Sequence, residues 1–235
     1  MPLSDLPRDP IHPRPTVLLA GATGLVGREL LCQLLCDPEV GEVRALVRRE
    51  LSAEALLGTP VGAMPGVGKL RIGVVDFERL AHHSDWFDVD WVASALGTTI
   101  RDAGSQAAFR RVDLDYPLQV MQLAHAQGAR RAMLVSAVGA RATSRVFYNR
   151  VKGELEDAVR DIGFEQVSVA RPSLLQGERS VLRPAERLGL AFGWLMPAPY
   201  KPVAARQVAA GLLNSAKAGV PGWHVLSNTA LRAMR

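Results

Sequence analysis

The segment 21–27, GATGLVG, joins an apolar run to an amphipathic run, and it constrains the fold more than any other part of the chain. The run before it, 16–20 (TVLLA), predicts a buried strand, and the run after it, 25–36, has the apolar spacing of a helix. Glycine weakens both kinds of element, so three glycines at this junction require a reason. A ligand with phosphate groups supplies one, because the free N–H groups and the dipole of a helix N-terminus attract anions.

Each glycine of this loop has an expected role. Gly21 would allow a sharp turn, Gly24 would let a diphosphate approach the backbone, and Gly27 would let the helix pack tightly on the strand. The spacing G-x-x-G-x-x-G is one residue longer in its first half than the usual dinucleotide fingerprint. Its place after the first strand nevertheless predicts a dinucleotide site that also includes Thr23, Leu25 and Val26. A glycine turn without a ligand is the alternative.

The rest of the chain alternates apolar runs with helical patterns. Strands are predicted at 42–47, 69–75, 90–96, 131–137, 166–172 and 223–227, and further helices at 104–127, 144–162 and 205–217. Strands that are apolar throughout and separated by helices indicate an α/β fold, a Rossmann-type doubly wound parallel sheet. We expect one NAD(P)-binding domain over 16–235, in which 173–222 forms a small substrate or lid region, after a flexible proline-rich tail at 1–15. Pro117 predicts a kink or a restart in the long helix.

The end of the second strand indicates which cofactor is bound. NAD-binding sites place an acidic residue there for the ribose 2′-hydroxyl, whereas a guanidinium can hold a 2′-phosphate. Arg48 and Arg49 follow this strand and favour NADP(H) over NAD(H), although Glu50 and a surface location of both arginines leave NAD(H) open. Asp76, just after the third strand, is placed either to accept from the adenine amino group or to cap the next helix.

A second group of residues has the chemistry of proton transfer. Tyr148 and Lys152 are four apart in a predicted helix and share one face. An ammonium beside a phenol lowers the pKa of the tyrosine, which then exchanges a proton with a carbonyl oxygen near neutral pH. Ser136 ends the fifth strand, where its hydroxyl can bond the same oxygen. The alternatives are a core aromatic for Tyr148 and, for the hydroxyl, Ser144 on the other side of the loop.

Several motifs together resemble the short-chain dehydrogenase/reductase superfamily, and more narrowly its atypical, Tat-interacting-protein-like subgroup. They are GATGLVG, ALGTT (95–99), VSAVGA (135–140), the Tyr-x-x-x-Lys motif with KGELE, and ARPSLLQGER (170–179). The resemblance implies that Tyr148 is the acid/base, that Lys152 binds the nicotinamide ribose, and that Ser136 orients the substrate carbonyl. It also implies cofactor contacts from Leu96, Gly97, Thr98 and Pro172.

Two features depart from the superfamily pattern. Many members carry a structural asparagine in the helix before the fifth strand, whereas this helix reads FRRVDLDYPLQ. The chain after the sixth strand is also too short for a full substrate domain, which makes a large nucleotide-sugar substrate unfavourable.

The resulting functional hypothesis is an NADP(H)-dependent oxidoreductase that reduces a small, apolar carbonyl compound or quinone. The alternatives are an NADP(H)-binding regulatory or interaction protein with little turnover, and an epimerase or isomerase that recycles its cofactor.

Composition restricts the partners and the location. The net charge is +5, but the arginines are scattered and no basic run occurs, which disfavours nucleic acid as a partner. Cys32 and Cys36 are four apart in a helix without further ligands nearby, so we expect buried thiols and no metal. The apolar stretch LGLAFGWLM is shorter than the ~20 residues of a membrane span, and no secretory signal is visible. These features predict a cytoplasmic protein without a membrane anchor, for which a homodimer is an option.

Overall fold

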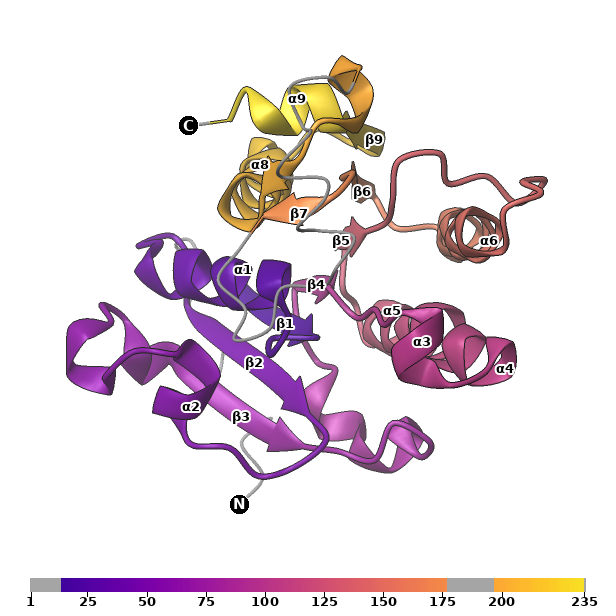
Figure 1. Ribbon diagram of the computed structural model, residues 1–235. Helices are drawn as coiled ribbons and strands as arrows, with labels where there is room; N and C mark the ends of the chain where they lie inside the picture. The colour runs from indigo at the N-terminus through magenta and orange to yellow at the C-terminus, as the bar shows by residue number, and fades with distance from the viewer. Residues whose placement is uncertain (1–13, 177–196, 235) are drawn as a thin grey trace.

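The computed structural model describes residues 14–176 and 197–234, and it consists of a parallel sheet with helices on both faces (Figure 1). The strands are β1 (Thr16–Ala20), β2 (Glu42–Val47), β3 (Leu70–Val74), β4 (Trp91–Ser94), β5 (Arg131–Val135), β6 (Gln166–Arg171), β7 (Leu175–Gln176), β8 (Val203–Ala204) and β9 (Gly222–Ser227). The α-helices are α1 (Leu25–Cys36), α2 (Ala53–Leu57), α3 (Ile100–Ala103), α4 (Gln106–Arg110), α5 (Tyr116–Ala126), α6 (Phe147–Ile162), α8 (Ala205–Ala218) and α9 (Asn228–Arg232).

The main sheet has seven strands in the order β3-β2-β1-β4-β5-β6-β9, and every adjacent pair is parallel. The strand order reverses between β1 and β4, because the chain runs outward from β1 to β3 and then returns to the other side of β1. In such sheets the crevice beyond the carboxyl ends of the strands at this reversal is where ligands bind. The predicted doubly wound Rossmann-type fold is therefore confirmed.

The central strand β1 shows why apolar runs become buried strands here. Successive side chains of a strand point to opposite faces, and β1 is buried on both. Val17 and Leu19 belong to the core on one face, and Leu18 and Ala20 belong to the core on the other. All four are fully buried, which a strand with one polar face could not achieve.

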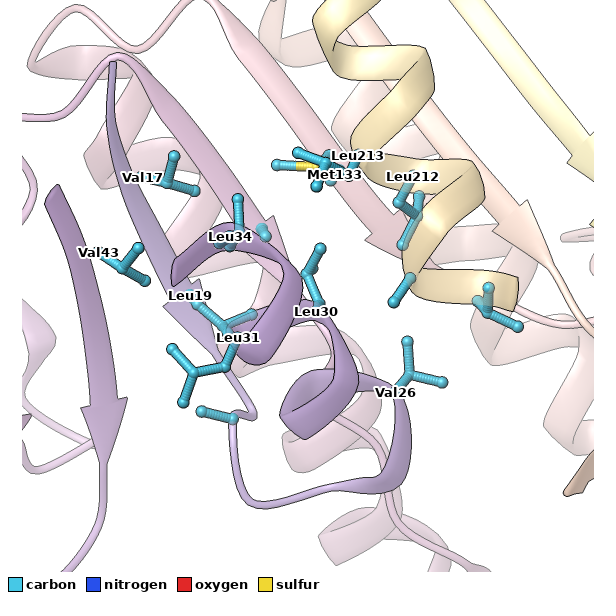
Figure 2. Close-up of a cluster of buried hydrophobic side chains, with 14 of the residues drawn as sticks. Val17, Leu19, Val26, Leu30, Leu31, Leu34, Val43, Met133, Leu212 and Leu213 are labelled. Atoms are coloured by element: carbon cyan, nitrogen blue, oxygen red, sulfur yellow. The ribbon is translucent and has the colours of Figure 1, made fainter. Parts of the chain in front are cut away.

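Helices α1 and α8 cover one face of the sheet, and α5 and α6 cover the other (Figure 1). Figure 2 shows α1 and α8 side by side over the strands, although residues 37–204 lie between them in the sequence. Burying each large aliphatic side chain contributes ~1.5–3 kcal/mol, so this layer fixes where α1 begins relative to β1. The side chains in this layer include Val17, Leu19, Val26, Leu30, Leu31, Leu34, Val43, Met133, Leu212 and Leu213.

The long helix predicted over 104–127 begins at Gln106 in the structure and contains a π-helical turn. Short helices α3 and α4 come first, a π-helical turn follows at Arg111–Asp115, and α5 then begins with Pro117 in its first turn. Proline has no N–H to donate, and its ring clashes with the carbonyl four residues earlier in a regular helix. The wider turn before Pro117 avoids that clash, and the backbone stays helical through 106–126, so the proline causes no restart of the helix.

The region after β6 returns to the sheet. β7 pairs with β8, and β9 joins β6 as the last strand, as the pattern at 223–227 predicts. The helix predicted at 205–217 is α8. Part of the expected lid, including Phe192, Trp194, Leu195 and Met196, lies outside the described residues, as does most of the expected tail at 1–15.

Candidate functional site

A cavity of about 760 Å³ opens at the carboxyl ends of β1, β2 and β4, where the strand order reverses. Its lining residues come from the loops after these three strands and from the helices that follow β4. They are Gly21, Thr23, Gly24, Leu46, Val47, Arg48, Arg49, Leu51, Phe77, Ala95, Leu96, Gly97, Thr98, Asp102, Ala103, Ala108, Val112 and Tyr116. The volume lies within the range of cofactor and small-molecule sites.

The glycine loop forms one wall of the cavity, and its geometry explains two of the three glycines. Gly21 has a φ of 89°, which other residues rarely adopt, and an added Cβ would lie 2.5 Å from the backbone of Ala95. A Cβ on Gly27 would lie 2.0 Å from the carbonyl oxygen of Gly21, so α1 packs on the loop too closely for any side chain. Gly24 is different, because a Cβ there would meet Gly21 oxygen at 3.4 Å, which is ordinary contact.

The N-terminus of α1 presents unpaired donors at this wall. Gly24 is its N-cap, no side chain caps the helix, and no acidic residue lies in the first turn. The first backbone bond of the helix runs from the Arg28 amide to the Gly24 carbonyl, so the amides of Leu25, Val26 and Gly27 have no intrahelical acceptor. Free amides and the helix dipole together make this an anion-binding end.

The far end of the cavity contains aromatic and cationic side chains. Arg48 and Arg49 line it and are exposed to solvent, as a contact with a charged ligand requires. Phe77 and Tyr116 line the same end, with their ring centroids 5.4 Å apart. Asp76 is not among the lining residues, and its carboxylate accepts from the Glu78 amide at 2.9 Å within a turn. It does not cap the next helix, which begins at Leu80 with Arg79 as its N-cap and no side-chain cap.

Tyr116 is held by a charged network. Its hydroxyl donates to Glu78 at 2.6 Å, and Arg111 lies 3.5 Å from the same carboxylate oxygen. Partial burial, followed by the hydrogen bond and charge of Glu78, raises the pKa of Tyr116 to about 12, and Arg48 and Arg111 oppose the rise. The Tyr116 phenol therefore stays protonated and neutral at the mouth of the cavity.

Lys152 lies directly behind the loop after β4. Its ammonium is 2.8 Å from the carboxylate of Asp113, and the second oxygen of that carboxylate accepts from the Thr98 amide at 2.8 Å. A Cβ on Gly97 would lie 3.7 Å from the Lys152 nitrogen, so only a glycine separates the ammonium from the cavity. Burial alone would lower the pKa of Lys152, but Asp113, Tyr148 and Glu156 together raise it above its ordinary value.

Tyr148 lies one helical turn before Lys152 on α6, as its spacing predicts. Its ring is half-buried and packs on Phe109, with the centroids 5.7 Å apart. The phenol is close enough to Lys152 for its charge to affect that residue's pKa. Neither Tyr148 nor Lys152 lines the cavity itself, so the pair stands at its edge, beyond Gly97 and Thr98.

Ser136 has a different set of partners from the one expected. Its hydroxyl donates to the carboxylate of Glu156, which also accepts two bonds from the guanidinium of Arg171. Ser136 and Glu156 are almost fully buried, and the bonds to Glu156 raise the pKa of Arg171. While this network holds, Ser136 has no proton left to donate to a substrate oxygen.

Pro172 links the loop after β6 to the loop after β5, because its carbonyl accepts from the Val138 amide at 2.8 Å. The next residue, Ser173, is fixed by Asn228, whose side chain accepts from the Ser173 amide and donates to the Lys201 carbonyl. The buried Asn228 thus joins the segments on either side of the undescribed stretch 177–196.

The structure brings most of the sequence-predicted residues to one crevice. Gly21, Thr23 and Gly24 of the glycine loop line it, as do Arg48, Arg49, Leu96, Gly97 and Thr98, and Lys152 lies behind it. Sequence reasoning missed Asp113, Glu156, Phe77 and Tyr116. One signal was available for Asp113: in the sequence VDLDY, this charged residue stands between the apolar residues Val112 and Leu114. None was available for the other three, whose partners are distant in sequence.

Comparison with known proteins gives relatives of similar length. No family model matches the chain. It is 35% identical over 183 residues to protein HTATIP2 of Rattus norvegicus, covering 77% of this chain and 72% of the relative. It is 32% identical over 180 residues to mitochondrial protein fmp52 of Emericella nidulans, covering 75% and 73%.

Solved structures show the same fold at low identity. WbmG of Bordetella bronchiseptica, in complex with NAD, superposes with a TM-score of 0.66 at 17% identity, over 93% of this chain and 74% of that one. A UDP-Glc/GlcNAc 4-epimerase of Campylobacter jejuni gives a TM-score of 0.69 at 11% identity, over 92% and 81%.

The comparisons correct one expectation. The fungal relatives of Emericella nidulans, Aspergillus fumigatus and Coccidioides immitis are named mitochondrial, which contradicts the cytoplasmic location expected from the sequence. Across 14–176 and 197–234, no helix is long and apolar enough to cross a membrane. The same residues hold no group of three or more His, Cys, Asp or Glu side chains that could bind a metal ion.

Proposed function

Because the chain belongs to the family of the HTATIP2 and FMP52 proteins, an atypical branch of the short-chain dehydrogenase/reductase superfamily, we propose that it is an NADP(H)-dependent oxidoreductase. Its substrate would be a small, apolar carbonyl compound or quinone. The observation that carries the proposal is the continuity of the cavity, which runs from the uncapped N-terminus of α1 to the loop in front of Lys152. The NAD complex of a neighbour with the same fold supports it.

The residues present fit a dinucleotide. The amides of Leu25, Val26 and Gly27 have no acceptor in the helix and offer three donors to a diphosphate. Gly24 leaves this approach free of a side chain, and Thr23 lines the same wall. At the other end of the cavity, Gly97 has no side chain to block the way to Lys152, so a ribose hydroxyl would reach the ammonium there.

The preference for NADP(H) rests on the end of β2. Arg48 and Arg49 both line the cavity, and a guanidinium forms paired, charge-assisted bonds with a phosphate. Glu50 is exposed next to them but is not among the lining residues, so the carboxylate that would favour NAD(H) does not face the cavity. This arrangement supports discrimination through the 2′-phosphate.

Bound NADPH supplies the hydride for such a reduction. In this proposal Tyr148 gives a proton to the carbonyl oxygen of the substrate, and Lys152 binds the ribose and keeps a positive charge beside the phenol. Pro172 borders the nicotinamide end. Ser136 stays a predicted substrate contact, but it can serve only if its bond to Glu156 is exchanged for one to the substrate.

Two measurements test the proposal. Fluorescence titration should show that NADPH binds at least about tenfold more tightly than NADH, the difference expected from one charge-assisted contact. Absorbance at the wavelength of reduced nicotinamide should then show steady NADPH oxidation with a member of an aldehyde and quinone panel. Tyr148→Phe should retain NADPH binding and lose turnover. If neither cofactor binds, or if Tyr148→Phe turns over as the wild type does, the proposal is wrong.

A second candidate is an NADP(H)-binding regulatory protein with little turnover. The engagement of the Ser136 hydroxyl with Glu156 favours it, because the predicted substrate donor is already occupied. Tight NADPH binding without oxidation across the whole panel would support this candidate. Product formation without net change in the cofactor would instead indicate an epimerase or isomerase; two neighbours of the same fold are named 4-epimerases.

A further inference from the structure

Asp113 is a fully buried carboxylate in the π-helical turn at Arg111–Asp115, and the proposed proton transfer does not use it. A buried carboxylate is costly unless its charge and its lone pairs are satisfied. Sequence alone gave this residue no role. Its burial at the cavity wall therefore requires a compensating interaction there.

The carboxylate forms an ion pair at one oxygen and a hydrogen bond at the other. One oxygen lies 2.8 Å from the Lys152 ammonium, and the other accepts from the Thr98 amide at 2.8 Å. An added Cβ on Gly97 would lie 3.4 Å from the first oxygen, so the ion pair lies immediately behind the backbone that lines the cavity. Asp113 thus joins α6 to the loop after β4.

The other charged and titratable groups near Lys152 cannot replace this carboxylate. Glu156 lies one turn further along α6, but it accepts from Ser136 and Arg171. Tyr148 lies one turn earlier on the same helix and is neutral in its protonated form. Among the described residues, Asp113 is therefore the carboxylate that forms an ion pair with Lys152.

We propose that Asp113 is a positioning residue of the cofactor site, whose carboxylate holds the Lys152 ammonium behind Gly97 and fixes the Thr98 backbone to the same point. The inference rests on the proposed function, since positioning has a purpose only if a cofactor ribose reaches Lys152. The stretch FRRVDLDYPLQ lacks the structural asparagine of many superfamily members, and its Asp113 instead makes a direct ion pair with Lys152.

The substitution Asp113→Asn isolates the charge, because it keeps the size of the side chain. An amide has one acceptor and one donor group, so it can satisfy Lys152 or the Thr98 amide but not both. Burial then acts on Lys152 without its ion-pair partner, which shifts the balance toward the neutral amine. Asp115→Asn is the matched control, because Asp115 lies in the same turn and is exposed.

The first measurement follows the protonation of Lys152 without any cofactor. The chain has lysines only at 69, 152, 201 and 217, so isotope-labelled lysine gives an NMR spectrum that Lys152→Arg assigns. In the wild type, Lys152 should remain charged beyond the ordinary lysine pKa of about 10.4. Asp113→Asn should lower its midpoint below that of the wild type, and Asp115→Asn should leave it unchanged.

The second measurement is NADPH binding. Asp113→Asn should weaken it about tenfold or more, with the loss growing as pH rises through the lowered Lys152 midpoint, and Asp115→Asn should bind as the wild type does. The inference is overturned if wild-type Lys152 titrates below the ordinary value, a result that holds even if Asp113→Asn does not fold. It is also overturned if both asparagine variants bind NADPH equally well. If the wild type binds neither cofactor, the proposed function fails, while the titration still decides whether the ion pair holds the charge.

Discussion

Replacing Gly24 and Gly27 separately with alanine should affect different properties of the protein, although both glycines belong to the same loop. Gly27→Ala should destabilise the protein, and Gly24→Ala should leave the fold intact but weaken cofactor binding. The same methyl group is added in both variants, so the difference depends only on what it meets. This comparison separates a glycine required for packing from a glycine required for a ligand.

For Gly27, the added Cβ would lie 2.0 Å from the Gly21 carbonyl oxygen and 3.0 Å from the Cα of Ala22. Relieving this overlap requires α1 to move on the order of 1 Å, because non-bonded heavy atoms sit at about 3.5 Å. That helix packs on β1 and beside α8 (Figure 2), and such overpacking costs about 1–3 kcal/mol. For a chain of this length, the melting temperature should fall by roughly 2–12 °C.

For Gly24, the backbone φ is −79°, which alanine adopts readily, and the added Cβ meets its nearest atom at 3.4 Å. Alanine lowers the conformational entropy of the unfolded chain, which stabilises the protein by ~0.4–1 kcal/mol, but it is a poorer N-cap than glycine. The two effects on the free energy of unfolding therefore nearly cancel. The methyl group would instead stand between the α1 amides and a bound diphosphate. One misplaced methyl group is worth about 1–3 kcal/mol, which is a tenfold or greater loss of NADPH affinity.

Thermal unfolding and fluorescence titration of NADPH measure both effects on the same samples. Gly68→Ala serves as the control, since its Cβ would have no atom within 4 Å. The reasoning fails if Gly27→Ala melts with the wild type, which would show that α1 is not held against the loop. It also fails if Gly24→Ala binds NADPH normally, because the diphosphate would then lie elsewhere.

Three further outcomes are expected. Arg48→Ala should weaken NADPH about tenfold and leave NADH unchanged, and if neither it nor Arg49→Ala does so, the 2′-phosphate is held elsewhere. The folded state raises the pKa of Tyr116 to about 12, so it favours the neutral phenol. The stability that this phenol contributes should be present below pH ~10 and lost as pH rises toward 12. In Tyr116→Phe, the urea midpoint of unfolding should no longer show this decline at high pH. Glu156→Gln should cost about 1–3 kcal/mol in urea unfolding, a value limited by the partial exposure of Arg171, and an unchanged midpoint would contradict the network.

The fold was predictable because its signals are local in the sequence. Apolar runs such as 16–20 become strands buried on both faces, and the helix at 25–36 has the boundaries that its pattern predicts. The roles of Gly21 and Gly27 also followed from the chain, since a positive φ and a close strand–helix contact are properties of a short segment. Strand ends were less certain: β4 and β5 stop slightly earlier than the apolar runs do, where the chain turns into loops.

The long helix before β5 shows where local pattern fails. Apolar periodicity continues through 104–127, but a π-helical turn interrupts the regular α-helix just before Pro117. The proline was visible in the sequence, yet the choice between a kink and a restart depends on how the neighbouring carbonyls are arranged in space. The same turn buries Asp113, although apolar periodicity alone gives no reason for a charged residue to be buried at this position.

The sequence by itself determined the strand–glycine–helix unit, the alternation that produces a parallel sheet, and the shared face of Tyr148 and Lys152. Those features depend on residues within a few positions of one another, so backbone geometry settles them. Only the tertiary structure decided the partners of the buried charges: Lys152 with Asp113, and Ser136 with Glu156 and Arg171. A charge in the interior takes whichever opposite group the packed chain brings within reach, and that group can come from any element of the fold.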